Sequence, residues 1–174
     1  MPHIRFSLAG PFAVSCAKQS ANALSKRIES KHVANFLQDE DVAEVAGKQG
    51  CYIFALRVGK GHTPWYVGKT SIALSAEIFT PDKLNKYNGV LYDDKKGTPV
   101  MFFVTRTDGR KSIPELKLHQ LEKFLIQRAY MKNPALINTA HTKNMALVAL
   151  HVAFSKPSEN SLIFKNFAEW LRYQ

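Results

Sequence analysis

The sequence predicts an α/β domain of the α+β kind, in which helices flank a small mixed sheet of three central strands. Residues 52–58 and 65–67 are short runs of apolar and β-branched residues, and the Gly- and Pro-rich loop between them is typical of a β-hairpin. Residues 100–104 are apolar throughout, which indicates a third strand covered on both faces. A chain of 174 residues is long enough for one such domain with extensions at both ends.

Residues 1–48 are expected to form an N-terminal extension that packs on the core. Apolar and polar residues alternate over 4–8, which predicts a half-buried strand. The next part of the pattern is ambiguous, since 20–27 are compatible with a short helix and 33–37 with a strand. The acidic start of the segment 38–47 predicts a helix that ends at its glycine.

The predicted hairpin places two tyrosines on neighbouring strands. Side chains alternate between the faces of a strand, so Tyr52 shares a face with Phe54. Tyr66 comes close to Tyr52 if the register pairs the two residues. Gly68 allows the backbone to turn sharply after the second strand, and a short helix is expected over 71–79.

A second helix is expected over 82–92, with Thr80 as its cap and a proline after the cap. Lys83, Lys86 and Tyr87 lie at i, i+3 and i+4, so they share one face of this helix. A basic and aromatic face suits contact with a nucleic-acid backbone. The same spacing is equally compatible with Tyr87 in the core and the two lysines in solvent.

A long helix is expected after Ser112, which has the pattern of a capping residue, with Pro114 and Glu115 behind it. Four apolar residues at helical spacing mark its buried stripe: Leu118, Leu121, Leu125 and Ala129. Glu122 borders this stripe. A carboxylate in that position must be ion-paired, hydrogen-bonded or bound to a cation.

The last part of the chain is expected to pack on the body of the domain. Residues 136–138 form a short buried stretch whose Asn138 side chain is expected to hold local backbone. Residues 146–174 are expected to form a C-terminal strand and helix, because the apolar run 147–154 is followed by amphipathic spacing.

The order of these features resembles that of the GIY-YIG nuclease family. The first signature of the family corresponds to Gly50-Cys51-Tyr52 and the second to Tyr66-Val67-Gly68. A downstream helix carries a glutamate, Glu122, and an asparagine, Asn138, follows that helix. The resemblance covers residues 49–140, and the GIY-YIG-like domain is expected to span 49–145.

The resemblance implies an endonuclease that hydrolyses phosphodiester bonds of nucleic acid, with DNA favoured over RNA. It implies one Mg²⁺ or Mn²⁺ ion per site, held by Glu122. Tyr52 and Tyr66 would position or deprotonate the attacking water. Gly50, Gly68 and Asn138 would brace the site.

The chain departs from the family at one position, because no arginine follows the second signature. Ala76 and Glu77 occupy that region. We expect either Lys69, or the pair of Lys83 and Lys86, to supply the missing positive charge. Three functions remain open: an active metal-dependent endonuclease, a nucleic-acid-binding module without catalysis, and a protein-interaction module that reuses the fold.

Charge and composition narrow the class of protein. The net charge is +10, and residues 51–174 carry 18 basic and 9 acidic residues, so the excess lies in the nuclease-like part. This favours a polyanionic partner, although a merely soluble basic surface is the alternative. Two widely separated cysteines give no disulfide framework, and no apolar run is long enough to span a membrane. A soluble, cytoplasmic protein is therefore expected.

Overall fold

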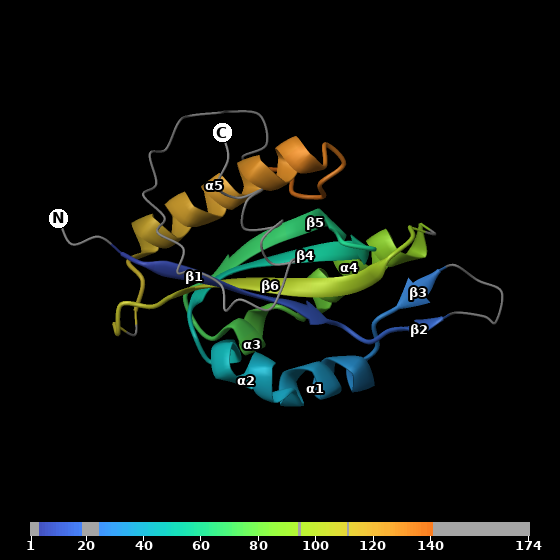
Figure 1. The fold of residues 1–174 in the computed structure, drawn as a ribbon, viewed down its shortest axis with the longest axis horizontal. Coiled ribbons are helices and arrows are strands. Elements are labelled where there is room, and N and C mark those ends of the chain that lie inside the picture. Colours follow the sequence, from blue (N-terminus) through green and yellow to red (C-terminus); the bar gives the residue numbers. More distant parts are fainter. Residues whose placement is uncertain (1–3, 19–24, 94, 111, 141–174) are drawn as a thin grey trace.

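The computed structural model describes residues 4–18, 25–93, 95–110 and 112–140. Helices and strands follow one another in this order: β1 (Phe6–Ala13), β2 (Ala17–Lys18), β3 (Lys26–Arg27), α1 (Ser30–Gln38), α2 (Glu40–Ala46), β4 (Gly50–Val58), β5 (Gly61–Thr70), α3 (Leu74–Glu77), α4 (Pro81–Tyr92), β6 (Thr98–Arg106) and α5 (Glu115–Lys132). Figure 1 shows α5 on one side of the main sheet, with α1 and α2 on the other side.

The main sheet has four strands in the order β1-β6-β4-β5, and the α+β fold class is confirmed. Strands β4, β5 and β6 contain the three predicted central strands, and β1 adds the expected N-terminal strand at one edge. All pairings are antiparallel, so the sheet is not mixed as predicted. The reason is that strand direction alternates along the order β1-β6-β4-β5, so strands that run in the same direction are never neighbours.

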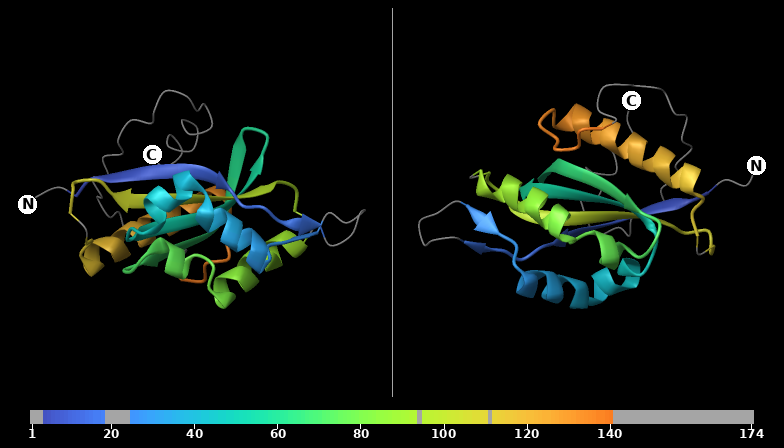
Figure 2. Two further views of the ribbon diagram at one scale, coloured as in Figure 1. Left: turned by 90° about the horizontal axis from the view of Figure 1, so that it is seen from below. Right: turned by 180° about the vertical axis from the view of Figure 1, so that it is seen from behind.

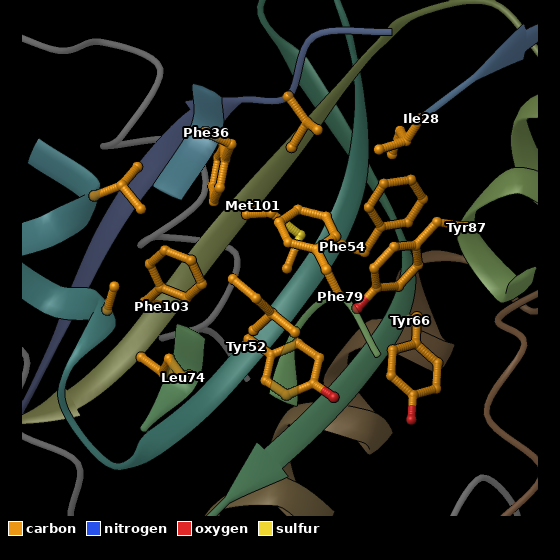
Figure 3. Packing of buried hydrophobic residues seen from close by; sticks show 14 of the residues in the cluster. Ile28, Phe36, Tyr52, Phe54, Tyr66, Leu74, Phe79, Tyr87, Met101 and Phe103 are labelled. Atoms are coloured by element: carbon orange, nitrogen blue, oxygen red, sulfur yellow. The ribbon is translucent and has the colours of Figure 1, made fainter. Parts of the chain in front are cut away.

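Side-chain alternation along β4 divides the core between the two faces of the sheet. Cys51, Ile53 and Ala55 belong to the cluster under α5, and we call this side the α5 face. Tyr52 and Phe54 belong to the second cluster, which is covered by α1 to α4, and we call this side the tyrosine face. Figure 2 shows helices covering both faces, and Figure 3 shows the packing of the second cluster.

Two predictions for the N-terminal part are corrected. Residues 33–37 lie in helix α1, not in a strand, because His32 and Phe36 bury one face of the helix at i, i+4 spacing. The predicted helix at 20–27 falls largely outside the described residues, and its last two residues form β3. The acidic helix is confirmed as α2, where the Asp39 side chain accepts hydrogen bonds from two free backbone amides.

The helices that follow the hairpin differ from prediction mainly at their ends. The helix expected over 71–79 is shorter, since only Leu74–Glu77 is helical. Helix α4 begins at Pro81 after Thr80, as predicted, but the Thr80 side chain makes no capping hydrogen bond. Helix α5 buries the predicted stripe but begins after Pro114 with no side-chain cap, so Ser112 lies too early in the chain to cap it.

The expected C-terminal strand and helix lie outside the described residues, as does the end of the predicted 49–145 domain. Within the described ranges up to residue 140, no helix combines the length and the apolar character that crossing a bilayer requires.

The strand Phe6–Ala13 pairs with β6, so the N-terminal extension contributes directly to the main sheet.

Candidate functional site

The tyrosines of the two signatures lie side by side on the tyrosine face. Tyr52 pairs with Gly68, and Tyr66 pairs with Phe54, so the two tyrosines are diagonal neighbours and not directly opposite each other. Their ring centroids are 6.2 Å apart and the ring planes are inclined by 41°. Figure 3 shows both rings at the same border of the core.

The two signature glycines allow close packing around these rings. A Cβ atom at Gly68 would overlap the phenol of Tyr52, and one at Gly50 would overlap the carbonyl oxygen of Val104 on β6. Only a residue without a side chain permits these approaches. Gly68 therefore leaves the space that the Tyr52 ring occupies over β5.

Tyr87 joins the tyrosines from α4 and is fully buried. Its ring stacks on Phe54 at a centroid distance of 4.3 Å and meets Tyr66 edge-on at 6.0 Å. Of the two alternatives for Tyr87, solvent or core, the structure shows the core. Its ring is not accessible for stacking on a nucleic-acid base, and the predicted binding role is corrected.

The hydroxyl groups of Tyr52 and Tyr87 are buried, and neither has a hydrogen-bond partner among the described residues. Burial raises the pKa of Tyr52, and the nearby Tyr87, Tyr66, Glu77 and Glu122 raise it further. Burial also raises the pKa of Tyr87 well above its usual value. Both phenols are therefore protonated at neutral pH, where they can donate hydrogen bonds but cannot take a proton from water.

Two lysines of α4 lie beside Tyr66. The Nζ atoms of Lys83 and Lys86 are 5.5 and 5.4 Å from the centroid of its ring. Lys83 also lies 3.5 Å from a carboxylate oxygen of Glu77, and Lys86 lies 2.7 Å from one of Asp82. Burial lowers the pKa of Lys83, but Tyr66, Glu77 and Asp82 outweigh it, so the net direction is upward.

These ion pairs offset part of the positive charge of the two lysines. Glu77, in the region where the family's arginine is expected, ends α3 and keeps a side chain that is 31% exposed. Its charge raises the pKa values of Tyr52 and Tyr87 after the larger effect of burial. The tyrosine face therefore carries a partly exposed carboxylate, Glu77, beside Lys83, whose side chain is only 16% exposed.

Lys69 does not join this group. The strand continues through Gly68 to Thr70, so Lys69 lies on the same face as Val67, opposite Tyr66. Its Nζ forms an ion pair with the Glu115 carboxylate, and this hydrogen bond is the main cause that raises the pKa of Lys69. The expectation that Lys69 supplies the cation next to the tyrosines is not supported by its position.

Glu122 belongs to α5 and approaches the tyrosines from the other side of the sheet. Its side chain is 17% exposed, and one carboxylate oxygen lies 3.6 Å from Nδ1 of His119. Glu122 makes a smaller contribution than burial, Tyr87, Tyr66 and Glu77 to the raised pKa of Tyr52, and its charge also raises the pKa values of Lys69 and Cys51 on the α5 face. Glu122 thus borders the site.

The fit of the site to a divalent ion depends on Glu122. Within the described ranges, no three His, Cys, Asp or Glu side chains gather into a group that could hold a metal. Mg²⁺ is commonly held by one or two carboxylates, with water and substrate phosphate as its other ligands. Glu122 fits this kind of ion, and a Zn²⁺-type cage of protein ligands is not formed by these residues.

Asn138 holds the edge strand next to Tyr66. Its amide oxygen accepts a hydrogen bond from the Val67 backbone N–H, and its amide nitrogen donates one to the Val67 carbonyl, both at 2.8 Å. Asn133, which the sequence analysis missed, donates to the Pro64 carbonyl at 2.8 Å. Asn133 directly follows a long helix and has apolar neighbours, and this position in the sequence could have indicated a buried side chain that binds backbone.

The structure thus brings Tyr52, Tyr66, Lys83 and Lys86 together on one face, with Glu122 at its border. Such a group can donate hydrogen bonds and place positive charge beside an anion. The chain has no significant match among protein-family models, curated proteins or solved structures, so the resemblance to the GIY-YIG nucleases rests on the sequence motifs alone.

Proposed function

We propose that the protein is a divalent-metal-dependent endonuclease that hydrolyses phosphodiester bonds of nucleic acid, with DNA as the preferred substrate class. The observation that carries this proposal is the position of Lys83 and Lys86, whose Nζ atoms are 5.5 and 5.4 Å from the Tyr66 ring centroid. Two ammonium groups beside a pair of signature tyrosines suit a phosphate group better than a neutral ligand.

In this reaction, the oxygen of water bonds to phosphorus, and the bond from phosphorus to the leaving nucleotide oxygen breaks. Negative charge increases on the phosphoryl oxygens in the transition state. Lys83 offsets this charge, and Tyr66 orients the water through its hydroxyl. Tyr52 is buried and protonated, so it supports the position of its neighbours and does not serve as the base.

Glu122 is the residue that would hold the divalent ion at the border of the site. A bound Mg²⁺ or Mn²⁺ ion supplies positive charge to the leaving oxygen. Asn138 keeps the Val67 backbone in place, and through it the adjacent Tyr66.

A nucleic-acid-binding module without cleavage is the second candidate, and one observation favours it. Glu77 and Asp82 pair with Lys83 and Lys86, which reduces the charge available to stabilise a transition state. A module of this kind would bind nucleic acid in a salt-dependent manner and leave it intact.

Nicking of a supercoiled plasmid, with Mg²⁺ or Mn²⁺ and with chelator, tests the proposal. We expect metal-dependent nicking by the wild type and its loss in Glu122→Ala. Glu44→Ala, which removes an exposed carboxylate on α2, is the matched control and should nick normally. Binding without cleavage of single-stranded, double-stranded and branched substrates would support the second candidate, and undetectable binding at low salt would favour a protein-interaction module.

A further inference from the structure

The proposed reaction needs a group that accepts a proton from the attacking water. Such a group must be within hydrogen-bond reach of a water molecule in the site. The hydroxyl oxygens of Tyr52 and Tyr87 have almost no accessible surface, so water arriving from solvent does not reach them. These two buried phenols are excluded as the proton acceptor.

Among the other groups on the tyrosine face, carboxylates are better proton acceptors than a phenol such as that of Tyr66, because a carboxyl group is ordinarily ionised at neutral pH and a phenol is not. Glu77 and Asp82 are both accessible and both contact Lys83, at 3.5 and 3.4 Å. The two differ in their surroundings: Asp82 lies 2.7 Å from Lys86 and has a side chain that is 64% exposed, whereas Glu77 is only 31% exposed. Glu77 is therefore the carboxylate that is better placed between solvent and the buried tyrosines.

The neighbours of Glu77 also place it at this border. Its charge acts on Tyr52 from β4, whereas Tyr87 from α4 feels the charges of both Glu77 and Asp82. Lys83, its ion-pair partner, lies with Nζ 5.5 Å from the Tyr66 ring. Glu77, Lys83 and Tyr66 thus form a connected group in which one member accepts protons and one carries positive charge.

We propose that Glu77 is the general base of the reaction, with Lys83 as the cation that holds it in place and then faces the phosphate. This inference rests on the proposed nuclease function. Glu77 takes a proton from water while the water oxygen bonds to phosphorus. The leaving oxygen separates from phosphorus and is protonated by solvent, and Glu77 then releases its proton to solvent.

A base and a merely neutralising carboxylate give opposite results in Glu77→Gln. The substitution removes the negative charge that pairs with Lys83, so in both cases nucleic acid should bind several-fold more tightly. If Glu77 is the base, single-turnover cleavage should nevertheless fall by about 10²–10⁴-fold, the usual contribution of a general base. If Glu77 only neutralises Lys83, cleavage should rise together with binding.

Asp82→Asn is the matched control, because it also frees α4 lysines from a carboxylate but leaves Glu77 intact. It should tighten binding without slowing cleavage. Binding is measured by fluorescence anisotropy of a labelled duplex oligonucleotide without metal, and cleavage under single-turnover conditions with Mg²⁺. Glu77→Asp keeps the carboxylate and should retain more cleavage than Glu77→Gln, which guards against a loss caused by misfolding.

Glu77→Gln that cleaves as fast as the wild type would overturn the assignment of the base and leave the nuclease function standing, provided that Glu122→Ala is inactive. A wild type that binds the duplex but never cleaves it would overturn the nuclease function, and the assignment of Glu77 with it.

Discussion

Asn138 binds both backbone groups of Val67, with two hydrogen bonds of 2.8 Å. The two residues are far apart in sequence, and the contact closes the outer edge of β5 beside Tyr66. An edge strand otherwise presents unpaired backbone groups to solvent or to other chains. Asn138 therefore substitutes for a neighbouring strand at the point where the site lies.

Asn138→Ala should lower the free energy of unfolding by about 1–3 kcal/mol, since two hydrogen bonds to partly buried groups are lost. Urea unfolding followed by circular dichroism measures this change. Asn35→Ala, which alters an exposed asparagine on α1, should change the free energy much less. Equal effects of the two substitutions would show that the Val67 contact adds nothing to stability.

The protein should lose stability in alkaline solution because of Tyr52 and Tyr87. The pKa of each is higher in the folded state than the usual value of about 10, so the folded state holds protons that the unfolded state releases. This contribution to stability is fully present below pH about 10 and is lost progressively as the pH rises above that value.

Tyr52→Phe removes one such group, so its free energy of unfolding should fall less between pH 7 and pH 11 than that of the wild type. Urea unfolding at several pH values checks this. Tyr92→Phe, at a position that is 64% exposed, is the control and should behave like the wild type. If the free energy of unfolding of Tyr52→Phe falls with pH as much as that of the wild type, the raised pKa of Tyr52 is not the cause of the alkaline loss of stability.

Much of the fold could be predicted from local patterns. Runs of apolar residues marked β4 and β6, because each strand is buried between two layers. The strand predicted at 33–37 was wrong, and these residues lie in α1. The burial of α1 depends on contacts of Phe36 with Phe79 and Phe103, which come from distant parts of the chain. Such contacts lie outside the local pattern, in which only the i, i+4 spacing of His32 and Phe36 indicates the helix.

The site could be predicted only in part. Side chains alternate between the two faces of β5, so Lys69 and Tyr66 lie on opposite faces. This could not be predicted, because a sharp turn was expected at Gly68, where the strand in fact continues. The ion pair of Glu77 with Lys83 joins two different helices, and its existence depends on how α3 and α4 pack. Helix spacing alone did not decide whether Tyr87 faces solvent or the core.

Lys83→Ala should slow cleavage by about 10²–10³-fold, the usual effect of removing a donor that stabilises transition-state charge. Binding of the intact substrate should weaken much less. Lys69→Ala should reduce cleavage less than Lys83→Ala, because Lys69 pairs with Glu115 on the α5 face and reaches the site only through its charge on Glu122. Single-turnover rates and equilibrium binding of one duplex separate the two effects, and a larger loss in Lys69→Ala than in Lys83→Ala would contradict this assignment.

Nucleic-acid affinity should fall steeply as salt rises, since binding releases condensed counterions. The double variant Lys83→Ala/Lys86→Ala should weaken binding to all sequences and reduce the slope of log K against log salt by about 2. Lys60→Ala/Lys117→Ala removes the same charge from exposed positions on the β4–β5 turn and α5, and should change the slope less. The prediction fails if the two double variants give the same slope.

We expect phosphodiester cleavage to take place on the tyrosine face, and the single-turnover rate of Tyr66→Phe is the measurement that decides this. The substitution keeps the ring that packs against Tyr52 and Tyr87 and removes only the hydroxyl. With Mg²⁺ and a duplex that the wild type cleaves, we expect the rate to fall by about 10²-fold, as for the loss of one transition-state hydrogen bond, while binding is unchanged. Cleavage by Tyr66→Phe at the wild-type rate would contradict the claim.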